Sequence, residues 1–270
     1  MNATPEGTTR FGPTFVNALA TRRERDEEGI IASVSVALSG PLVPASLLDR
    51  PHRFSIRARC GPDDEVVEAH LPDPGRLSAT LVPGARVWLR ASDSPRRRTA
   101  WTAVLAQASE GILLSLDTQL PNRLVKAALQ QNALPEFDGF DLERTEAPVG
   151  RSRFDFLLRD RMGHALYLEV KGVTWSVRGV GRFPDAPSAR AARHLAEAIR
   201  MAGRPATSAC VLFICQRHDV EAVEPASDID PVFCSAFAEA RAAGVRFIAR
   251  RCLVTLSEVT LGISLPVRGP

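Results

Sequence analysis

The chain has 270 residues, which is enough for one large domain or two small ones. Hydrophobic residues make up 45% and charged residues 24%, as in ordinary globular proteins, and the absence of any run of about 18 apolar residues excludes a membrane-spanning helix. The net charge is only +3, but residues 50–100 and 144–204 are each basic while the other segments are acidic, which favours a localised site for a polyanion.

The N-terminal residues 1–10 are polar and lack the apolar stretch of a signal peptide, and the five cysteines are scattered instead of forming a disulfide framework. We therefore expect a cytoplasmic protein that does not contact a membrane. Residues 1–41 read as an N-terminal extension, with a mixed charge run and one strand at residues 30–38.

Short strands separated by turn residues are expected throughout residues 42–108. Phe54, Ile56, Ala58 and Cys60 alternate with polar residues, and this period of two is typical of a strand. Further strands are expected at 65–71, 86–91, 101–107 and 112–116, with Pro and Gly residues in the turns between them. Several short strands at this spacing predict a small barrel or sandwich.

Residues 109–270 change to a pattern of helices and strands. Helices are expected at 119–134, 188–203 and 230–243, where Ser188 can cap the second helix and Gly203 can end it. Two strands joined by a turn are expected within 152–173, a fully buried strand at 207–216 and a last strand at 245–256. This order predicts an α/β domain with helices packed on a central sheet.

The strand that begins at Ser152 has two faces of different chemistry. Phe154, Phe156 and Leu158 are expected to share one face, and Arg153 and Asp155 the other, because side chains alternate along a strand. We expect the apolar face to pack on the core, which leaves the acidic side chain on a polar side of the sheet.

The second strand of this pair carries Glu169 and Lys171 on one face. The midpoint of positions 155 and 169 falls inside the turn at 159–163, so a symmetric hairpin sets Asp155 opposite Glu169, with Cβ atoms about 4.5–5.5 Å apart. Two carboxylates so close repel each other unless one is protonated or a cation lies between them. A divalent cation such as Mg²⁺, which binds carboxylates together with substrate phosphates, is the natural occupant.

Lysine is scarce in this chain, which makes its position informative. Only Lys126 and Lys171 occur, against 32 arginines, so a site that keeps a lysine has a need for an ammonium group. A cation beside such a lysine is the arrangement that phosphodiester hydrolysis needs, because the metal activates water and the ammonium stabilises phosphate charge. The alternative is a surface ion pair beside an unrelated aspartate.

These residues carry a resemblance to a known family. Asp155 followed by Glu169-Val170-Lys171 resembles the PD-(D/E)xK nuclease motif, and residues 42–268 are similar to the sugar fermentation stimulation protein family (SfsA). The stretches that carry the second resemblance are 117–124, 151–156, 169–174, 183–188, 194–195 and 228–231. The chain departs from this family at Gly172, where Asn or Ser is usual, and within residues 70–75, where a Cys and an Asn are missing.

The resemblance implies an OB-like β-barrel at 42–108 followed by a restriction-endonuclease-like α/β domain at 109–270. It implies DNA binding and an inferred nuclease activity, with Asp155 and Glu169 as metal ligands and Lys171 as the catalytic lysine.

Arginines are the candidates for nucleic-acid binding, since they can contact phosphates. The expected contacts come from Arg53, Arg57, Arg96, Arg97, Arg98 and Arg153. Trp88 and Trp101 could stack on bases, but a place in the barrel core is the favoured interpretation.

Four further residues have two interpretations each. Asp185 and His194 could lie beside the site, or serve as a helix cap and an ordinary helix histidine. Asn122 and Glu136 could place a polar or acidic group near the metal, although a loop position is favoured for Glu136 because it follows a proline.

The leading hypothesis is a nucleic-acid-binding protein, with DNA favoured over RNA, that cleaves phosphodiester bonds with Mg²⁺ or Mn²⁺. The alternatives are a DNA-binding regulator that keeps the nuclease fold without cleaving, and an enzyme that acts on a small phosphorylated ligand. The sequence leaves the oligomeric state open.

Overall fold

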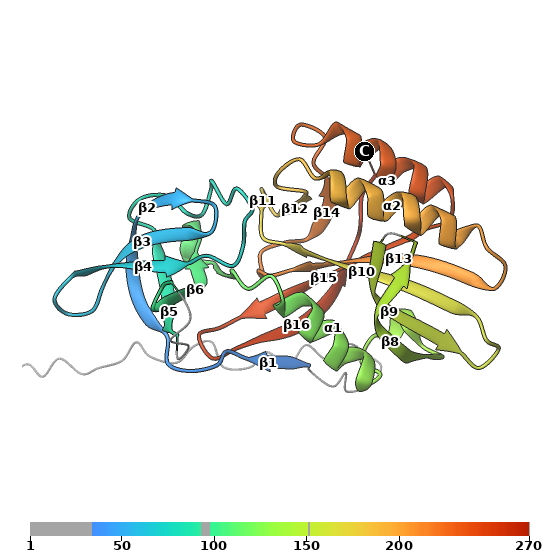
Figure 1. Cartoon of the computed structure of the whole chain (residues 1–270), viewed down its shortest axis with the longest axis horizontal. Coiled ribbons are helices and arrows are strands. Elements are labelled where there is room, and N and C mark those ends of the chain that lie inside the picture. Colours follow the sequence, from blue (N-terminus) through green and yellow to red (C-terminus); the bar gives the residue numbers. More distant parts are fainter. Residues whose placement is uncertain (1–33, 93–97, 151, 270) are drawn as a thin grey trace, which may run out of the picture. The chain divides into compact units, whose positions relative to one another are not determined.

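Three sheets and three α-helices organise the residues that the computed structural model describes, which are 34–92, 98–150 and 152–269 (Figure 1). No helix within these ranges is long and apolar enough to cross a membrane.

A closed barrel forms the first part. Its sheet has the order β4-β3-β2-β5-β6-β7, and a parallel pairing of β4 with β6 closes the five strands β2 to β6 on themselves. The strands are β2 (Val43–His52), β3 (Ser55–Cys60), β4 (Glu65–His70), β5 (Arg86–Ala91), β6 (Trp101–Gln107) and β7 (Leu113–Ser115). The predicted OB-like barrel is therefore confirmed, and the strands expected at 86–91 and 101–107 are found with the same bounds.

The alternation expected in β3 is present, because Ile56, Ala58 and Cys60 are buried in the barrel core while Arg57 is exposed. Phe54 departs from it. This residue lies in the turn before β3 and is 40% exposed.

A seven-stranded sheet forms the centre of the second part, with the order β1-β16-β15-β13-β10-β9-β8. Its strands are β1 (Ser35–Ala37), β8 (Phe140–Val149), β9 (Ser152–Asp160), β10 (Ala165–Val173), β13 (Thr207–Cys215), β15 (Arg246–Val254) and β16 (Glu258–Leu265). A small sheet of β11 (Ser176–Val177), β12 (Val180–Phe183) and β14 (Ala222–Pro225) lies beside it, and short 3₁₀ turns occur at Ser109–Gly111 and Pro135–Phe137.

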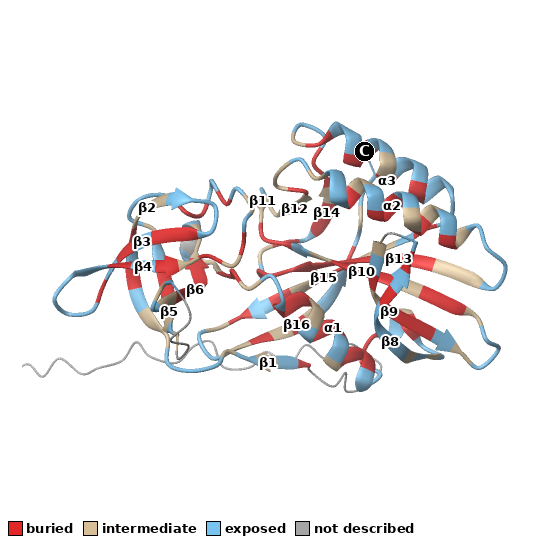
Figure 2. Cartoon of the chain, in the orientation of Figure 1, coloured by how far each residue is buried: buried red, intermediate tan, exposed pale blue. Residues whose placement is uncertain are grey.

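Helices cover both faces of this sheet. On one face α1 (Leu120–Gln130) packs in a core with Leu168 and Leu212, and on the other α2 (Ala189–Ala202) and α3 (Pro231–Ala242) pack with Phe213. Successive residues of β13 thus point into two different cores, which explains its nearly continuous apolar sequence. Figure 2 shows the result, since buried residues run along the central strands β10 and β13.

The helix ends follow the capping rules used above. Ser188 Oγ accepts a hydrogen bond from the Ala191 amide at 3.1 Å, which confirms it as the cap of α2, and Gly203 ends this helix. Asp230 caps α3 through Phe233 at 2.9 Å, and its second oxygen accepts from the Ser188 amide at 2.8 Å. One carboxylate therefore holds the starts of both helices.

Two parts of the sequence prediction need correction. No strand is predicted between residues 134 and 152, but Phe140 begins the ten-residue strand β8 at the edge of the sheet, where charged residues are exposed and no alternating apolar pattern forms. Strand β1 pairs with β16, so Ser35–Ala37 belong to the α/β sheet although they precede residue 42. The domain boundaries at 41/42 and 108/109 otherwise stay predictions.

Candidate functional site

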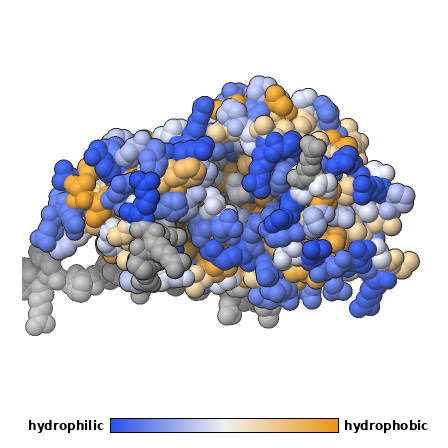
Figure 3. Space-filling view, in the orientation of Figure 1, coloured by the Kyte–Doolittle hydropathy of each residue, from blue (hydrophilic) through white to orange (hydrophobic). Residues whose placement is uncertain are grey.

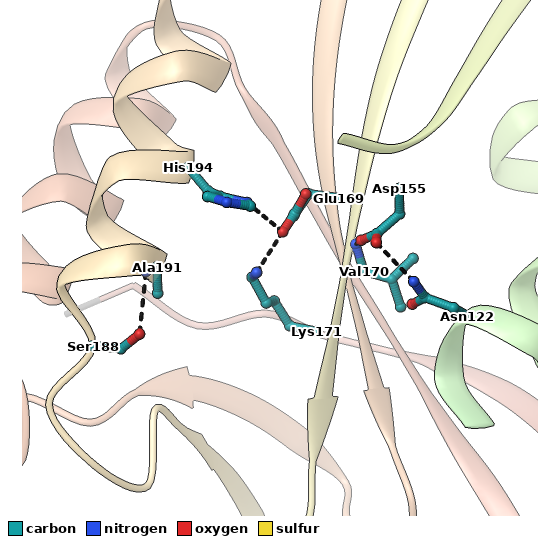
Figure 4. A network of polar contacts seen from close by, with 8 residues as sticks. All are labelled: Asn122, Asp155, Glu169, Val170, Lys171, Ser188, Ala191 and His194. Carbon is teal, nitrogen blue, oxygen red and sulfur yellow. Dashed lines mark hydrogen bonds and ion pairs between the residues drawn. The ribbon is translucent and has the colours of Figure 1, made fainter. Parts of the chain in front are cut away.

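Asp155, Glu169 and Lys171 lie together where strands β9 and β10 stop pairing (Figure 4). The antiparallel ladder pairs Leu166 with Leu158 and Leu168 with Phe156, which is the register that the symmetric hairpin predicts. The ladder ends there, one step before the two carboxylates. The Asp155 carboxylate therefore takes a place that a strand partner would occupy, and its Oδ2 accepts a hydrogen bond from the Val170 amide at 2.7 Å.

The expected division into an apolar and a polar face is wrong at Phe154. Phe156 and Leu158 pack on the α1 side of the sheet, but Phe154 packs on the α2 side, with its ring centroid 5.6 Å from that of Tyr167. Phe154 lies two residues beyond the end of the β9–β10 ladder, so the pairing with β10 no longer fixes its face. The side of the sheet that carries Glu169 is also less polar than expected, because α2 covers this side and Glu169 is only 3% exposed.

Glu169 is a buried carboxylate with all of its donors on one oxygen. Its Oε1 accepts from Lys171 Nζ and from His194 Nδ1, each at 2.5 Å, while Oε2 is buried without a hydrogen-bond partner. Burial alone would raise the pKa of Glu169, but the hydrogen bond from His194 and the charge of Lys171 outweigh it and hold this pKa below its ordinary value. Glu169 therefore stays ionised.

Asp155 has the opposite environment. Its Oδ1 accepts from Asn122 Nδ2 of α1 at 2.7 Å, and this amide and the Val170 amide are its hydrogen-bond donors. Burial, followed by the negative charge of Glu169, raises the pKa of Asp155 to about 6. The two carboxylates thus differ in how firmly they hold their charge, because only Glu169 has an ammonium group on it.

The donor chemistry fits a divalent cation. Carboxylate oxygens are the ligands that Mg²⁺ and Mn²⁺ prefer, and a buried carboxylate oxygen without a partner is a group that needs a cation or a proton. Among the described residues no cluster of three or more His, Cys, Asp or Glu could hold a metal. Asp155 and Glu169 are the two carboxylates that could hold such a cation, with water or substrate completing its shell.

The candidate arginines do not gather around these carboxylates. Arg53 lies on the exposed turn before β3 with its guanidinium 4.7 Å from the Phe54 ring centroid, and Arg98 is exposed. Arg57 is paired with Asp49, and Arg153 with Glu146 at 3.0 Å. Arg96 and Arg97 lie outside the described residues. Within those residues, no hydrogen bond or ion pair joins any candidate arginine to the carboxylates or to Lys171.

One face of the molecule is mostly hydrophilic. Hydrophilic side chains cover most of the face drawn in Figure 3, and hydrophobic ones occur in small separate groups. Trp88 is 6% exposed but packs in the core that contains Leu120 and Leu124 of α1, so it is buried outside the predicted barrel core. Trp101 is half-buried and packs against the barrel core, as the core interpretation predicts.

The structure decides between the interpretations of Asn122, His194 and Glu136. Asn122 and His194 reach the site from opposite faces of the sheet, the first onto Asp155 and the second onto Glu169 (Figure 4). Glu136 instead binds Arg250 through both oxygens, at 2.9 and 3.1 Å, and takes no part in the site. The role of His194 could not be read from the sequence, because His194 lies 25 positions after Glu169 and no spacing rule connects the two.

Comparisons with known proteins agree with this architecture. The family model described as "Sugar fermentation stimulation protein RE domain" matches residues 119–258, and the one described as "SfsA N-terminal OB domain" matches residues 48–115. Curated sugar fermentation stimulation protein homologs are 41% identical in Shouchella clausii, covering 84% of this chain and 97% of that one, and 44% identical in Chloroflexus aurantiacus, covering 87% and 88%. The structure of Pyrococcus furiosus SfsA in complex with Ca²⁺ is 26% identical, covers 88% of this chain and 99% of that one, and superposes with a TM-score of 0.77.

Proposed function

The chain belongs to the sugar fermentation stimulation protein family, and we propose that it is a cytoplasmic protein that binds nucleic acid and hydrolyses phosphodiester bonds. The cation of the reaction is Mg²⁺ or Mn²⁺, held by Asp155 and Glu169. One observation carries this proposal, namely that Glu169 is 3% exposed, stays ionised and has a buried oxygen without a partner beside a second carboxylate. The Ca²⁺ in the Pyrococcus furiosus relative supports a divalent cation in this family.

When bound, the cation would neutralise phosphate oxygens and lower the pKa of a bound water. Lys171 supplies the remaining positive charge, because its ammonium contacts Glu169 and its side chain is 17% exposed. From this position it can turn toward a phosphate oxygen or the attacking water. An arginine would be a poor substitute, since a guanidinium does not give up its proton in proteins.

The polyanion is nucleic acid, with DNA favoured over RNA. Arg53 and Arg98 are exposed and have no ion-pair partner among the described residues, so their charges are available to phosphates. Arg57 and Arg153 already hold carboxylates and would give less to binding, because each must first leave its partner. The arginines hold the strand in place, and the carboxylates with Lys171 act on it.

The test is metal-dependent cleavage by the purified full chain. Labelled single- and double-stranded DNA and RNA are incubated with Mg²⁺, Mn²⁺ or EDTA, beside Lys171→Ala and, as a matched control, Lys126→Ala in the other lysine of the chain. We expect cleavage that needs the cation, is lost in Lys171→Ala and is kept in Lys126→Ala. Salt-dependent binding without cleavage in every condition would instead establish a DNA-binding regulator on a nuclease fold.

A further inference from the structure

His194 contacts the carboxylate of Glu169 and restricts its orientation. The ring is 7% exposed, and its Nδ1 lies 2.5 Å from the same carboxylate oxygen that Lys171 Nζ contacts, also at 2.5 Å. The second oxygen of Glu169 has no donor. We propose that His194 is a positioning residue that keeps Oε1 occupied and thereby leaves Oε2 as the oxygen that receives the cation.

The ring is held firmly enough for this role. It lies on α2, whose start is fixed by the Ser188 cap (Figure 4) and by the bond from the Ser188 amide to Asp230. The same face of α2 packs Leu195 into the core, and the ring rests on Phe154 with centroids 6.5 Å apart. A donor fixed by a helix start and a packed core has little rotational freedom, so it can impose one orientation on the carboxylate.

The bond does not depend on the charge of the ring. An ionised carboxylate only accepts hydrogen bonds, so the proton must lie on Nδ1 in either charge state of the imidazole. The neutral tautomer with Nδ1–H is sufficient for positioning. The inference therefore follows from the contact and the burial alone.

His194 also frees Lys171 for the reaction that we propose. If Lys171 were the sole donor to Oε1, its turn toward a phosphate would leave a buried carboxylate with no hydrogen bond at all, which is costly for a buried acceptor and more so for a charged one. With His194 in place, one donor stays on Oε1 while the ammonium moves. His194 thus holds Glu169 in place, while Lys171 is free to contact the substrate.

Two amide variants separate this role from simple packing. In His194→Asn the amide nitrogen stands where Nδ1 stands in histidine, whereas in His194→Gln it lies one bond farther along the side chain. Both variants keep a polar amide of similar character, so both should fold, which thermal unfolding in EDTA checks. His164→Asn is the control, because this histidine precedes the other end of β10 and bonds Ser208 at 3.1 Å, away from the carboxylates.

The readout is calorimetric binding of Mn²⁺ to the full chain without nucleic acid, followed by single-turnover cleavage. We expect His194→Gln to lose about 10–100-fold in Mn²⁺ affinity, as is common when the partner of a metal ligand is removed, while His194→Asn stays close to the wild-type chain. Equal affinity in all three, or an equal loss in both variants, would overturn the inference. A loss in His164→Asn of the same size would overturn it too.

This inference rests on the proposed cation site, but its failure can be told apart from failure of the proposed reaction. A wild-type chain that binds Mn²⁺ and cleaves nothing would contradict the proposed reaction. The Mn²⁺ affinities of the two amide variants would still test whether His194 positions Glu169.

Discussion

Replacing Asp155 by asparagine should make the metal-free protein more stable at neutral pH, although it removes a proposed metal ligand. Burial and the charge of Glu169 raise the pKa of Asp155 from an ordinary 3.8 to about 6. A carboxyl group with a raised pKa contributes its stability below the unfolded pKa and loses it as pH rises through the folded pKa. At 1.36 kcal/mol for each pKa unit, ionised Asp155 lowers the free energy of unfolding by about 3 kcal/mol above pH 7.

Asparagine avoids this loss and keeps the hydrogen bonds. Its oxygen can accept from the Val170 amide, and its amide can donate to Asn122 once the Asn122 amide turns over. We therefore expect Asp155→Asn to be more stable than wild type by up to about 3 kcal/mol at pH 8 in EDTA, with the difference disappearing below about pH 4.

The assay is urea unfolding of both proteins at pH 8, 6 and 4 in EDTA, with equal m values as the sign that only stability has changed. Mn²⁺ should then stabilise the wild type and not the variant, because a ligand that binds only the folded state raises its stability. A variant no more stable than wild type at pH 8, or one with the same gain at pH 4, would refute the reasoning.

Three further predictions concern Glu169, a close-packed glycine and the exposed arginines. Glu169→Gln should destabilise the metal-free protein at neutral pH, because the pKa of this group is lowered, and the difference should shrink in urea unfolding as pH falls below about 4.5; a pH-independent difference would contradict this. Gly75→Ala should lower the free energy of unfolding by roughly 1–3 kcal/mol, since a Cβ there would stand 2.1 Å from the buried Oδ2 of Asp185. Gly203→Ala is the control and should change this free energy little, because the nearest atom to its Cβ would be 3.6 Å away. Equal denaturation midpoints for the two variants would contradict the clash. Arg98→Ala should reduce the salt dependence of DNA binding by about one unit of slope and Arg57→Ala by less, as measured by fluorescence anisotropy; the reverse order would show that the ion pair of Arg57 opens on binding.

The parts of the fold that could be predicted from the sequence are those whose signal is local. The period-two alternation in β3, the serine cap and glycine end of α2, and the uninterrupted apolar sequence of β13 each report on nearby residues only. Strand β8 gave no such signal, because its residues are largely exposed and charged and its strand character comes from pairing with β9. Edge strands of this kind are fixed by tertiary contacts that a sequence pattern does not contain.

The candidate site, too, could be predicted from the sequence only in part. The register of the hairpin follows from the turn between its strands, so the approach of Asp155 to Glu169 could be predicted from positions alone. The burial of the site could not, because it depends on α2 and α1 closing over the two faces of the sheet. Burial under these helices is the largest influence on the pKa of each carboxylate and raises it, while the donors that the helices supply, Asn122 and His194, lower it.

Asp155 and Glu169 have different hydrogen-bond donors, and this difference affects the affinity of the site for a cation. If a second ammonium stood beside Asp155, both acids would be neutralised and no unbalanced negative charge would remain to attract a metal. The donors on Asp155 are instead the neutral amides of Asn122 and Val170, which do not offset burial and the charge of Glu169, so its pKa rises. The free energy that this buried charge removes from folding, about 3 kcal/mol, is available again when a cation binds, and it corresponds to about a hundredfold in affinity. The instability of the metal-free site and its affinity for the cation therefore have the same cause, the buried charge of Asp155. A variant that is more stable without metal because it lacks this charge should bind the cation more weakly.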